Sequence, residues 1–306
     1  EDEFYHIGAD FVVKGEGEEK LPLLLKALAN QNFDEAKAVL EMPDACKKRS
    51  YTSPYTDEYL KRINGRIAYI ESSRGCPYRC SYCLSSETTG LVYYPVEAIF
   101  DDIKKLVDAK ARVIKFVDRS FNVNEEYSLK IWDFIREFKD ESVTFHFEIN
   151  PDILTKRQME SLISMPVGLV QLEAGIQSVN PKTLKEVSRV MNVQKAVENL
   201  KTLMEKGNIH IHVDLIAGLP YEDMDSFRES FNTIYQIGAH HLQLGFLKLL
   251  HGTRLRREAS LHGYKYRDYP PYEVIENKYI SAAEMLEIKD IEEALDRTLN
   301  SGRFDY

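Results

Sequence analysis

Short apolar runs alternate with longer amphipathic stretches along the chain from residue 66 onward. A run of about four to eight apolar residues is typical of a buried strand, and apolar positions three or four apart are typical of a helix packed on it. The pattern predicts strands at 66–70, 113–117, 143–148, 169–173, 209–216 and 242–246. It predicts helices after them at 95–108, 125–138, 155–164, 181–188, 193–206 and 224–237. Repeated strand–helix units predict an α/β fold with a parallel sheet, here a partial (β/α)6 TIM-like barrel rather than a closed eight-stranded one.

The predicted barrel leaves a segment of the chain on each side. We expect three parts: an N-terminal segment at 1–65, the barrel at 66–250 and a C-terminal extension at 251–306. The extension contains Tyr264, Tyr266, Tyr269 and Tyr272, and its periodicity predicts an amphipathic helix over 272–298. In α/β barrels the active site lies at the C-terminal ends of the strands. Candidate residues are therefore expected where the strands end.

Polar side chains recur at alternate positions in three of the predicted strands. They are His146 and Glu148, Gln171 and Glu173, and His210, His212 and Asp214. Because side chains alternate between the two faces of a strand, each set lies on one face, and we expect a polar barrel interior. The last three residues do not form one metal site, since they spread over about 13 Å along the strand.

The composition narrows the possible partners. The chain has 306 residues, 43% of them hydrophobic and 29% charged, as in a globular protein. No apolar run is long enough to span a bilayer and no signal peptide is visible, so we expect a cytoplasmic protein without a membrane partner. The net charge of −9 disfavours a nucleic-acid partner, which requires clustered Lys and Arg.

Three of the four cysteines lie within eight residues. Cys76, Cys80 and Cys83 have CxxxCxxC spacing, which suits three thiolates on one [4Fe–4S] cluster with the fourth iron open. Zinc is the alternative, but structural zinc sites usually have four ligands in two pairs. The remaining cysteine, Cys46, lies 30 residues before Cys76 and is expected to be a buried or idle thiol. The spacing therefore favours the iron–sulfur cluster.

The cysteine segment resembles the CxxxCxΦC motif of the radical S-adenosylmethionine (SAM) superfamily. Tyr82 stands at the aromatic position before the last cysteine, and the segment follows the first predicted strand as in that family. The resemblance implies an enzyme that binds SAM at the open iron and cleaves it reductively to methionine and a 5′-deoxyadenosyl radical. It also implies an electron donor such as flavodoxin or ferredoxin, and a substrate that the sequence does not identify.

Later strand ends extend the resemblance over about 65–250. The candidate residues there are Glu148, Glu173, Gln177, Arg189, Asp214 and Ile216. The family pattern assigns Gln177 and Asp214 to the SAM ribose and Arg189 to the methionine carboxylate, with Glu148 also beside the SAM. It places Ile216, like Tyr82, near the adenine.

One stretch departs from the common family pattern. Where many members have a glycine-rich segment after the second strand, this chain has Val117-Asp118-Arg119-Ser120-Phe121. This variant is similar to that of B12-type relatives. It makes Asp118 and Ser120 candidate contacts to the SAM amino group.

Both ends of the chain resemble parts of B12-associated radical SAM proteins. Residues 7–18 resemble the last strand and exit of a cobalamin-binding domain, most of which would precede residue 1; a lone edge strand and turn is the alternative. Cobalamin is therefore implied only for a longer form of the protein. Residues 247–255, 270–273 and 300–304 resemble an uncharacterised domain that follows the barrel in one group of these proteins.

Alternative functions remain open at this point. The barrel motifs also fit an oxygen-independent coproporphyrinogen III oxidase-like enzyme. A methylthiotransferase is disfavoured, because those enzymes carry a second three-cysteine site and a basic RNA-binding domain. A non-catalytic iron–sulfur protein for electron transfer or sensing is the alternative from another class, and it would not need the SAM-binding set.

Overall fold

The structure is a computed structural model, and it describes residues 8–42, 51–87, 90–139 and 141–303. The chain divides into two compact units, Glu1–Thr52 and Ser53–Tyr306, which are considered separately. Among the described residues, no helix combines the length and the apolar character needed to cross a bilayer.

The first unit contains a pair of helices, α2 (Gly17–Ala29) and α3 (Phe33–Glu41). Leu24 and Ala27 of α2 pack against Ala36 and Val39 of α3. The expected strand within 7–18 is wrong, because residues 8–16 form no strand and a helix begins at Gly17. Acidic side chains in the first turn of α2 favour a helix N-terminus at this point.

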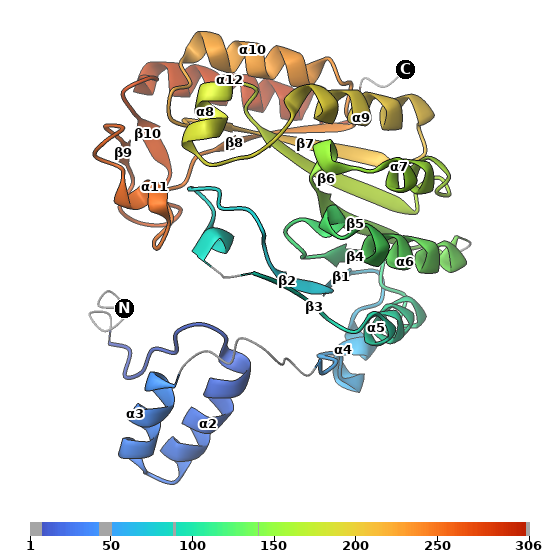
Figure 1. The fold of residues 1–306 in the computed structure, drawn as a ribbon, viewed down its shortest axis with the longest axis vertical. Helices are drawn as coiled ribbons and strands as arrows, with labels where there is room; N and C mark the ends of the chain where they lie inside the picture. The colour runs from blue at the N-terminus through green and yellow to red at the C-terminus, as the bar shows by residue number, and fades with distance from the viewer. Residues whose placement is uncertain (1–7, 43–50, 88–89, 140, 304–306) are drawn as a thin grey trace. The chain divides into compact units, whose positions relative to one another are not determined.

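The second unit is built on a six-stranded parallel sheet whose strands lie in chain order (Figure 1). The strands are β1 (Ile67–Ile70), β4 (Val113–Phe116), β5 (Thr144–Ile149), β6 (Val170–Gln177), β7 (His210–Ala217) and β8 (His241–Phe246). The helices along it are α5 (Val96–Asp108), α6 (Glu125–Ile135), α7 (Lys156–Ile163), α8 (Pro181–Glu186), α9 (Val193–Lys206) and α10 (Met224–Tyr235). This arrangement confirms the expected partial barrel.

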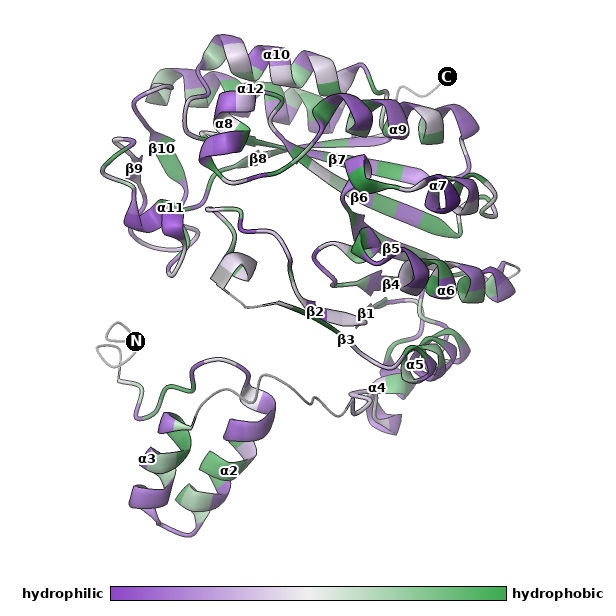
Figure 2. Ribbon diagram, viewed as in Figure 1, coloured by the Kyte–Doolittle hydropathy of each residue, from purple (hydrophilic) through white to green (hydrophobic). Residues whose placement is uncertain are grey.

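The two faces of this sheet differ in polarity. On the outer face, Phe116 and Phe147 stack with ring centroids 4.5 Å apart, and Phe121 and Trp132 pack beside them. On the inner face the alternate positions are polar and only partly buried, as the burial pattern of β6 and β7 shows. Figure 2 shows hydrophilic and hydrophobic residues mixed along the strands. The expected polar interior is therefore present.

Further elements lie around the sheet. They are α4 (Asp57–Arg62), the hairpin strands β2 (Ser73–Gly75) and β3 (Leu91–Tyr93), α11 (Arg254–Arg257), β9 (Lys265–Tyr266), β10 (Val274–Glu276) and α12 (Ala282–Arg297). The expected helix over 272–298 is wrong in its first part, where β10 pairs with β9. The helix begins only after Ser281, whose hydroxyl and the Glu284 carboxylate form a capping box.

Candidate functional site

The cysteine loop begins at the hairpin of β2 and β3. Gly75, the residue before Cys76, has a φ of +101°, and a Cβ there would lie 2.2 Å from the carbonyl oxygen of Gly90. Only glycine tolerates both this backbone conformation and this close approach. The hairpin therefore fixes the direction in which the loop leaves the sheet.

Asp118 also holds the start of this loop. Its carboxylate is 1% exposed and accepts hydrogen bonds from the Ser72 N–H at 3.0 Å, the Ser72 hydroxyl at 2.7 Å and the Ser73 hydroxyl at 2.5 Å. Burial raises the pKa of Asp118 despite these bonds. The structure thus directs Asp118 toward the β1–β2 connection, where it positions the cysteine loop.

The far side of the loop is held by segments distant in the sequence. The Ser81 N–H donates to the Val187 carbonyl, and the Leu255 N–H donates to the Ser81 carbonyl, both at 2.9 Å. Tyr82 and Ile216 pack against the same apolar cluster, to which the C-terminal extension contributes. Burial raises the pKa of the Tyr82 phenol. The two residues expected near the adenine therefore share one environment.

The three thiols of the loop differ in their surroundings. Cys80 is 6% exposed, whereas Cys76 and Cys83 are partly exposed. The Cys76 sulfur lies 3.9 Å from the Ser120 hydroxyl, and burial raises the pKa of the Cys76 thiol. Arg189 Nη1 donates to the Cys80 sulfur at 3.9 Å. Two of the candidate SAM contacts thus lie beside two of the candidate cluster ligands.

Within the described residues, no three His, Cys, Asp or Glu side chains converge closely enough to hold one metal ion. The loop offers three free cysteine thiols, a donor set that suits a [4Fe–4S] cubane because its thiolates bind separate iron atoms. Cys46 lies outside the described residues.

Arg189 is held in place by groups that the sequence does not bring together. Its Nη2 donates to Asn150 Oδ1 at 3.0 Å and to the Gly175 carbonyl. Its Nε is buried with no hydrogen-bond partner among the described residues. A buried guanidinium N–H without a partner is costly, and a ligand carboxylate would satisfy it. Arg189 follows α8 rather than closing it, since the helix ends at Glu186.

Asn150 is a residue that sequence reasoning missed. It follows β5 directly, is buried, and donates from Nδ2 to the Ser120 hydroxyl at 2.9 Å while its Oδ1 accepts from Arg189. It therefore links Ser120, beside Cys76, to Arg189, beside Cys80. Its position at a strand end was the signal that could have identified it.

A bulge at the end of β6 places Gln177. The pairing of β6 with β7 shifts between Gly175 and Gln177, and Gln177 has a φ of +75°. A Cβ at position 175 would lie 2.1 Å from Gln177 Nε2 and 3.8 Å from Asp214 Oδ2. The absence of a side chain at Gly175 thus allows the Gln177 amide to fold back toward Asp214.

Three carboxylates face one another on the inner face. Glu148 and Glu173 are direct neighbours in the β5–β6 pairing. Burial and the charge of Glu173 raise the pKa of Glu148. Burial, Glu173 and Glu148 raise the pKa of Asp214 to about 7. The His146 imidazole, whose Nε2 lies 3.0 Å from Glu173 Oε2, instead lowers the pKa of Glu173 to about 2.

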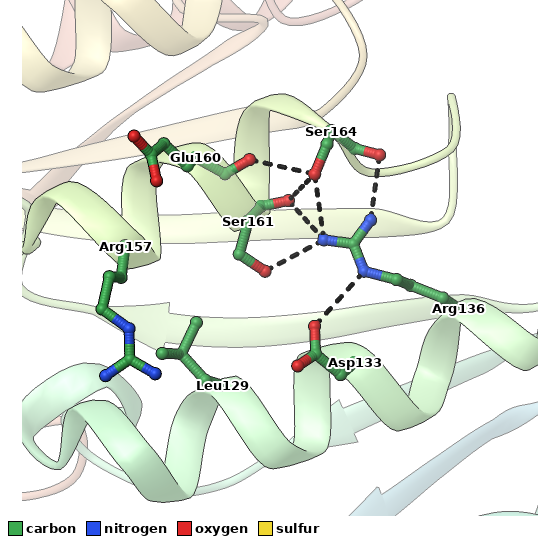
Figure 3. A pocket seen from close by; sticks show the side chains of 7 residues that line it. All are labelled: Leu129, Asp133, Arg136, Arg157, Glu160, Ser161 and Ser164. Atoms are coloured by element: carbon green, nitrogen blue, oxygen red, sulfur yellow. Dashed lines mark hydrogen bonds and ion pairs between the residues drawn. The ribbon is translucent and has the colours of Figure 1, made fainter.

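A surface groove between α6 and α7 lies away from this site (Figure 3). Arg136 donates there to the carbonyls of Ser161 and Ser164, near the C-terminal end of α7, at 2.7 and 2.9 Å. Its guanidinium helps to satisfy carbonyls at the end of the helix, where the Ser161 carbonyl also accepts from the Ser164 hydroxyl. The groove therefore reflects helix packing.

Comparison with curated proteins reveals distant relatives. Over 242 residues the chain is 25% identical to the hopanoid C-3 methylase of Methylococcus capsulatus, an alignment covering 74% of this chain and 45% of that protein. Over 266 residues it is 24% identical to the ribosomal protein uS12 methylthiotransferase RimO of Nitratiruptor sp., covering 81% and 59%. The chain spans about half the length of the curated relatives it matches.

Solved structures share the fold. The structure of the radical SAM methyltransferase TsrM from Kitasatospora setae, with tryptophan substrate and a SAM analogue bound, matches with a TM-score of 0.67 and 16% identity. That match covers 88% of this chain and 58% of TsrM. Coproporphyrinogen III oxidase (HemN) from Escherichia coli matches with a TM-score of 0.53 and 13% identity, covering 78% and 55%.

Two family matches cover most of the second unit. Residues 260–306 match a family described as protein of unknown function (DUF4080), which confirms the expected uncharacterised C-terminal domain. Residues 70–234, more than half of the chain, match the radical SAM superfamily and include the cysteine loop and the ends of β5, β6 and β7. The chain belongs to the radical SAM superfamily.

Proposed function

We propose that this protein is an enzyme that cleaves SAM reductively and directs the resulting 5′-deoxyadenosyl radical to a substrate still to be identified. The observation that carries the proposal is the position of Arg189. Its guanidinium contacts the Cys80 sulfur, Asn150 and the Gly175 carbonyl, and keeps one buried N–H without a partner. A cation between the cysteine loop and the β6 bulge suits a ligand carboxylate.

Cys76, Cys80 and Cys83 would hold the [4Fe–4S] cluster of this superfamily. Bound there together with SAM and reduced by an electron donor, such a cluster would supply one electron for cleavage of a carbon–sulfur bond of the sulfonium. The protein's part is to fix the thiols through the hairpin at Gly75 and the Asp118 contacts. Burial of Cys80 limits water near its own sulfur atom.

Each part of SAM has suitable partners among the strand ends. We assign the methionine carboxylate to Arg189 and the ribose hydroxyls to Gln177 and Asp214. A carboxylate accepts hydroxyl hydrogen bonds best when ionised, so the pKa of Asp214 near 7 makes ribose binding sensitive to pH. Tyr82 and Ile216 would enclose the adenine, because both pack on one apolar cluster.

The remaining candidates have more limited roles. Ser120 lies near Cys76 and is a candidate contact to the SAM amino group, as is Glu148 on the same face. Glu173, held by His146 and Lys115, supplies a fixed negative charge. We assign Asp118 to loop positioning, since three hydrogen bonds already satisfy its carboxylate.

The proposal extends to the domains and partners. We place the barrel at 66–250, the N-terminal segment at 1–65 and the C-terminal extension at 251–306. An electron donor such as flavodoxin or ferredoxin would reduce the protein. Cobalamin would belong to a longer form only; one matching structure is the cobalamin-dependent SAM radical enzyme OxsB with aqua-cobalamin and SAM bound, at a TM-score of 0.54.

Anaerobic reconstitution with iron and sulfide tests the proposal. We expect a brown chromophore with about four irons per chain and, after reduction with SAM, equal amounts of methionine and 5′-deoxyadenosine. Cys80→Ala should lose both chromophore and products, whereas Cys46→Ala should keep both. A chromophore without SAM cleavage would favour the non-catalytic iron–sulfur alternative, and one tightly bound zinc per chain would overturn the cluster assignment.

A further inference from the structure

The inner face continues below the candidate SAM site as ordered rows of polar side chains. In the strand pairing, Lys115 of β4 is level with His146 of β5, His146 with Gln171 of β6, and Gln171 with His210 of β7. We call these four residues the lower row. The lower row lies two residues, or about 6.6 Å, before the row that contains Glu148 and Glu173.

This row does not serve the packing of the barrel. Interiors of closed α/β barrels are filled mainly by Val, Ile and Leu. Here His146 is buried, while Lys115, Gln171 and His210 keep contact with solvent. A polar row that remains within reach of solvent on the ligand-facing side of the sheet is suited to binding rather than to packing.

Hydrogen-bond donors dominate the lower row. It contains no carboxylate, and two of its members contact one atom of the next row: Lys115 Nζ lies 3.1 Å and His146 Nε2 3.0 Å from Glu173 Oε2. The other N–H groups of Lys115, and the amide of Gln171, have no partner among the described residues. The lower row itself therefore carries no anionic acceptor, and the carboxylate that contacts Lys115 and His146 belongs to the next row.

The charge along the strands changes in a regular way. The lower row carries the lysine, the next row carries Glu148 and Glu173, and Asp214 follows at the level of Gly175. A molecule extending along the strands from the SAM site would meet carboxylates first and donors last. The lower row can recognise the far end of such a molecule if that end carries an oxyanion, because an oxyanion accepts hydrogen bonds from lysine and imidazole.

Resting on the proposed function, we propose that the lower row (Lys115, His146, Gln171 and His210) binds the oxyanion of a small polar substrate whose reacting part points toward the SAM site. The shared chemistry is that of a carboxylate or a phosphate. A hydrocarbon substrate does not fit this face, because it would strip water from charged and hydrogen-bonding groups without replacing their partners.

The test uses the cluster-loaded protein with SAM and with 15N in its histidine rings. Succinate and glycerol 3-phosphate are the anionic probes, and ethanolamine is the cationic one. We expect at least one anion to shift the ring signals of His146 and His210 saturably, with no shift from ethanolamine. Loss of a signal in His210→Gln identifies that residue.

Lys115→Met should weaken anion binding at least tenfold and Lys115→Arg should retain most of it. Lys156→Met, at an exposed lysine of α7, is the matched control and should bind as the parent does. Should Lys115→Met fail to fold, His210→Gln serves as the second variant, with an expected loss of severalfold.

The outcomes separate the two proposals. SAM cleavage with no anion-induced shift, a shift from ethanolamine alone, or unchanged anion affinity in Lys115→Met overturns the lower-row assignment and leaves the proposed function intact. Failure to cleave SAM overturns the proposed function, and the substrate role of the lower row with it.

Discussion

The two faces of the six-stranded sheet use the same backbone for opposite purposes. On the outer face Phe116 and Phe147 are fully buried, and their burial supplies favourable free energy of folding. On the inner face the neighbouring positions hold Glu148, Glu173 and Asp214, whose charges repel one another. One face therefore stabilises the protein, and the other retains unfavourable electrostatics that a ligand can relieve.

The largest expected effect comes from breaking the outer face. Phe147→Ala should lower the free energy of unfolding by about 3–5 kcal/mol, because it leaves a cavity among buried aromatic rings. The adjacent Glu148→Gln should change it by less than about 1 kcal/mol or raise it, since it removes a repelled carboxylate. Urea unfolding measures both. Equal losses in the two variants would contradict the division between faces.

Asp214 gives the inner face a pH-dependent cost in stability. The pKa of Asp214 is raised to about 7 in the folded protein, whereas it is about 3.9 in the unfolded chain. The folded protein therefore binds the proton of the Asp214 carboxyl group more tightly. Stability from this group is present below pH 4 and is lost as the pH rises through 7. Asp214→Asn should remove this loss of unfolding free energy. At about 1.4 kcal/mol per pKa unit, the gain at pH 8 is on the order of 2–4 kcal/mol.

Unfolding measured from pH 4 to 8 tests this expectation. Glu222 keeps its own pH dependence in the variant, because burial raises its pKa to about 7 as well. SAM affinity should show the opposite trend in the parent, rising as Asp214 ionises, and should become weaker and nearly independent of pH in Asp214→Asn. Parallel stability curves for the two proteins would refute the assignment.

Local sequence patterns predicted the strands of the sheet and the helices on its outer face well. Apolar runs and helical periodicity depend on neighbouring residues, so they gave the six strands and the helices that follow them. Alternation also predicted the polar inner face, and matching motifs pointed to its strand ends. Boundaries were less accurate where tertiary pairing decides them, as in β6, which continues to Gln177 rather than ending at 173.

Contacts between distant segments account for what the sequence did not give. Asn150 joins Ser120 to Arg189 only after the ends of β4 and β5 meet the segment that follows α8. Asp118 is a polar residue at a strand end like the others, yet its carboxylate binds Ser72 and Ser73. The strand β10 forms because β9 lies beside it, and periodicity alone read that stretch as helix. None of these pairings has a local signature.

Arg189→Lys should affect ligand binding more than stability. Lysine keeps the positive charge but loses the planar fork that contacts Asn150, the Gly175 carbonyl and a ligand carboxylate together. We expect SAM affinity to fall roughly 10- to 100-fold, corresponding to about 1.4–2.7 kcal/mol. Isothermal titration measures it, and Lys185→Arg, at the end of α8, is a control. Unchanged affinity would remove Arg189 from the carboxylate role.

The smallest expected effect concerns Gly175, whose missing side chain leaves room for the Gln177 amide on the inner face. In Gly175→Ala the new methyl would lie 2.1 Å from Gln177 Nε2, the flexible end of a side chain, so the amide moves rather than the strand. The free energy of unfolding should therefore change by about 1 kcal/mol or less. SAM affinity should fall severalfold, because the amide leaves its place beside Asp214. Ala174→Gly, at a buried position facing the helices, should show the reverse, with lower stability and unchanged affinity. Equal responses of the two variants would mean that the missing side chain at Gly175 does not set the position of the Gln177 amide.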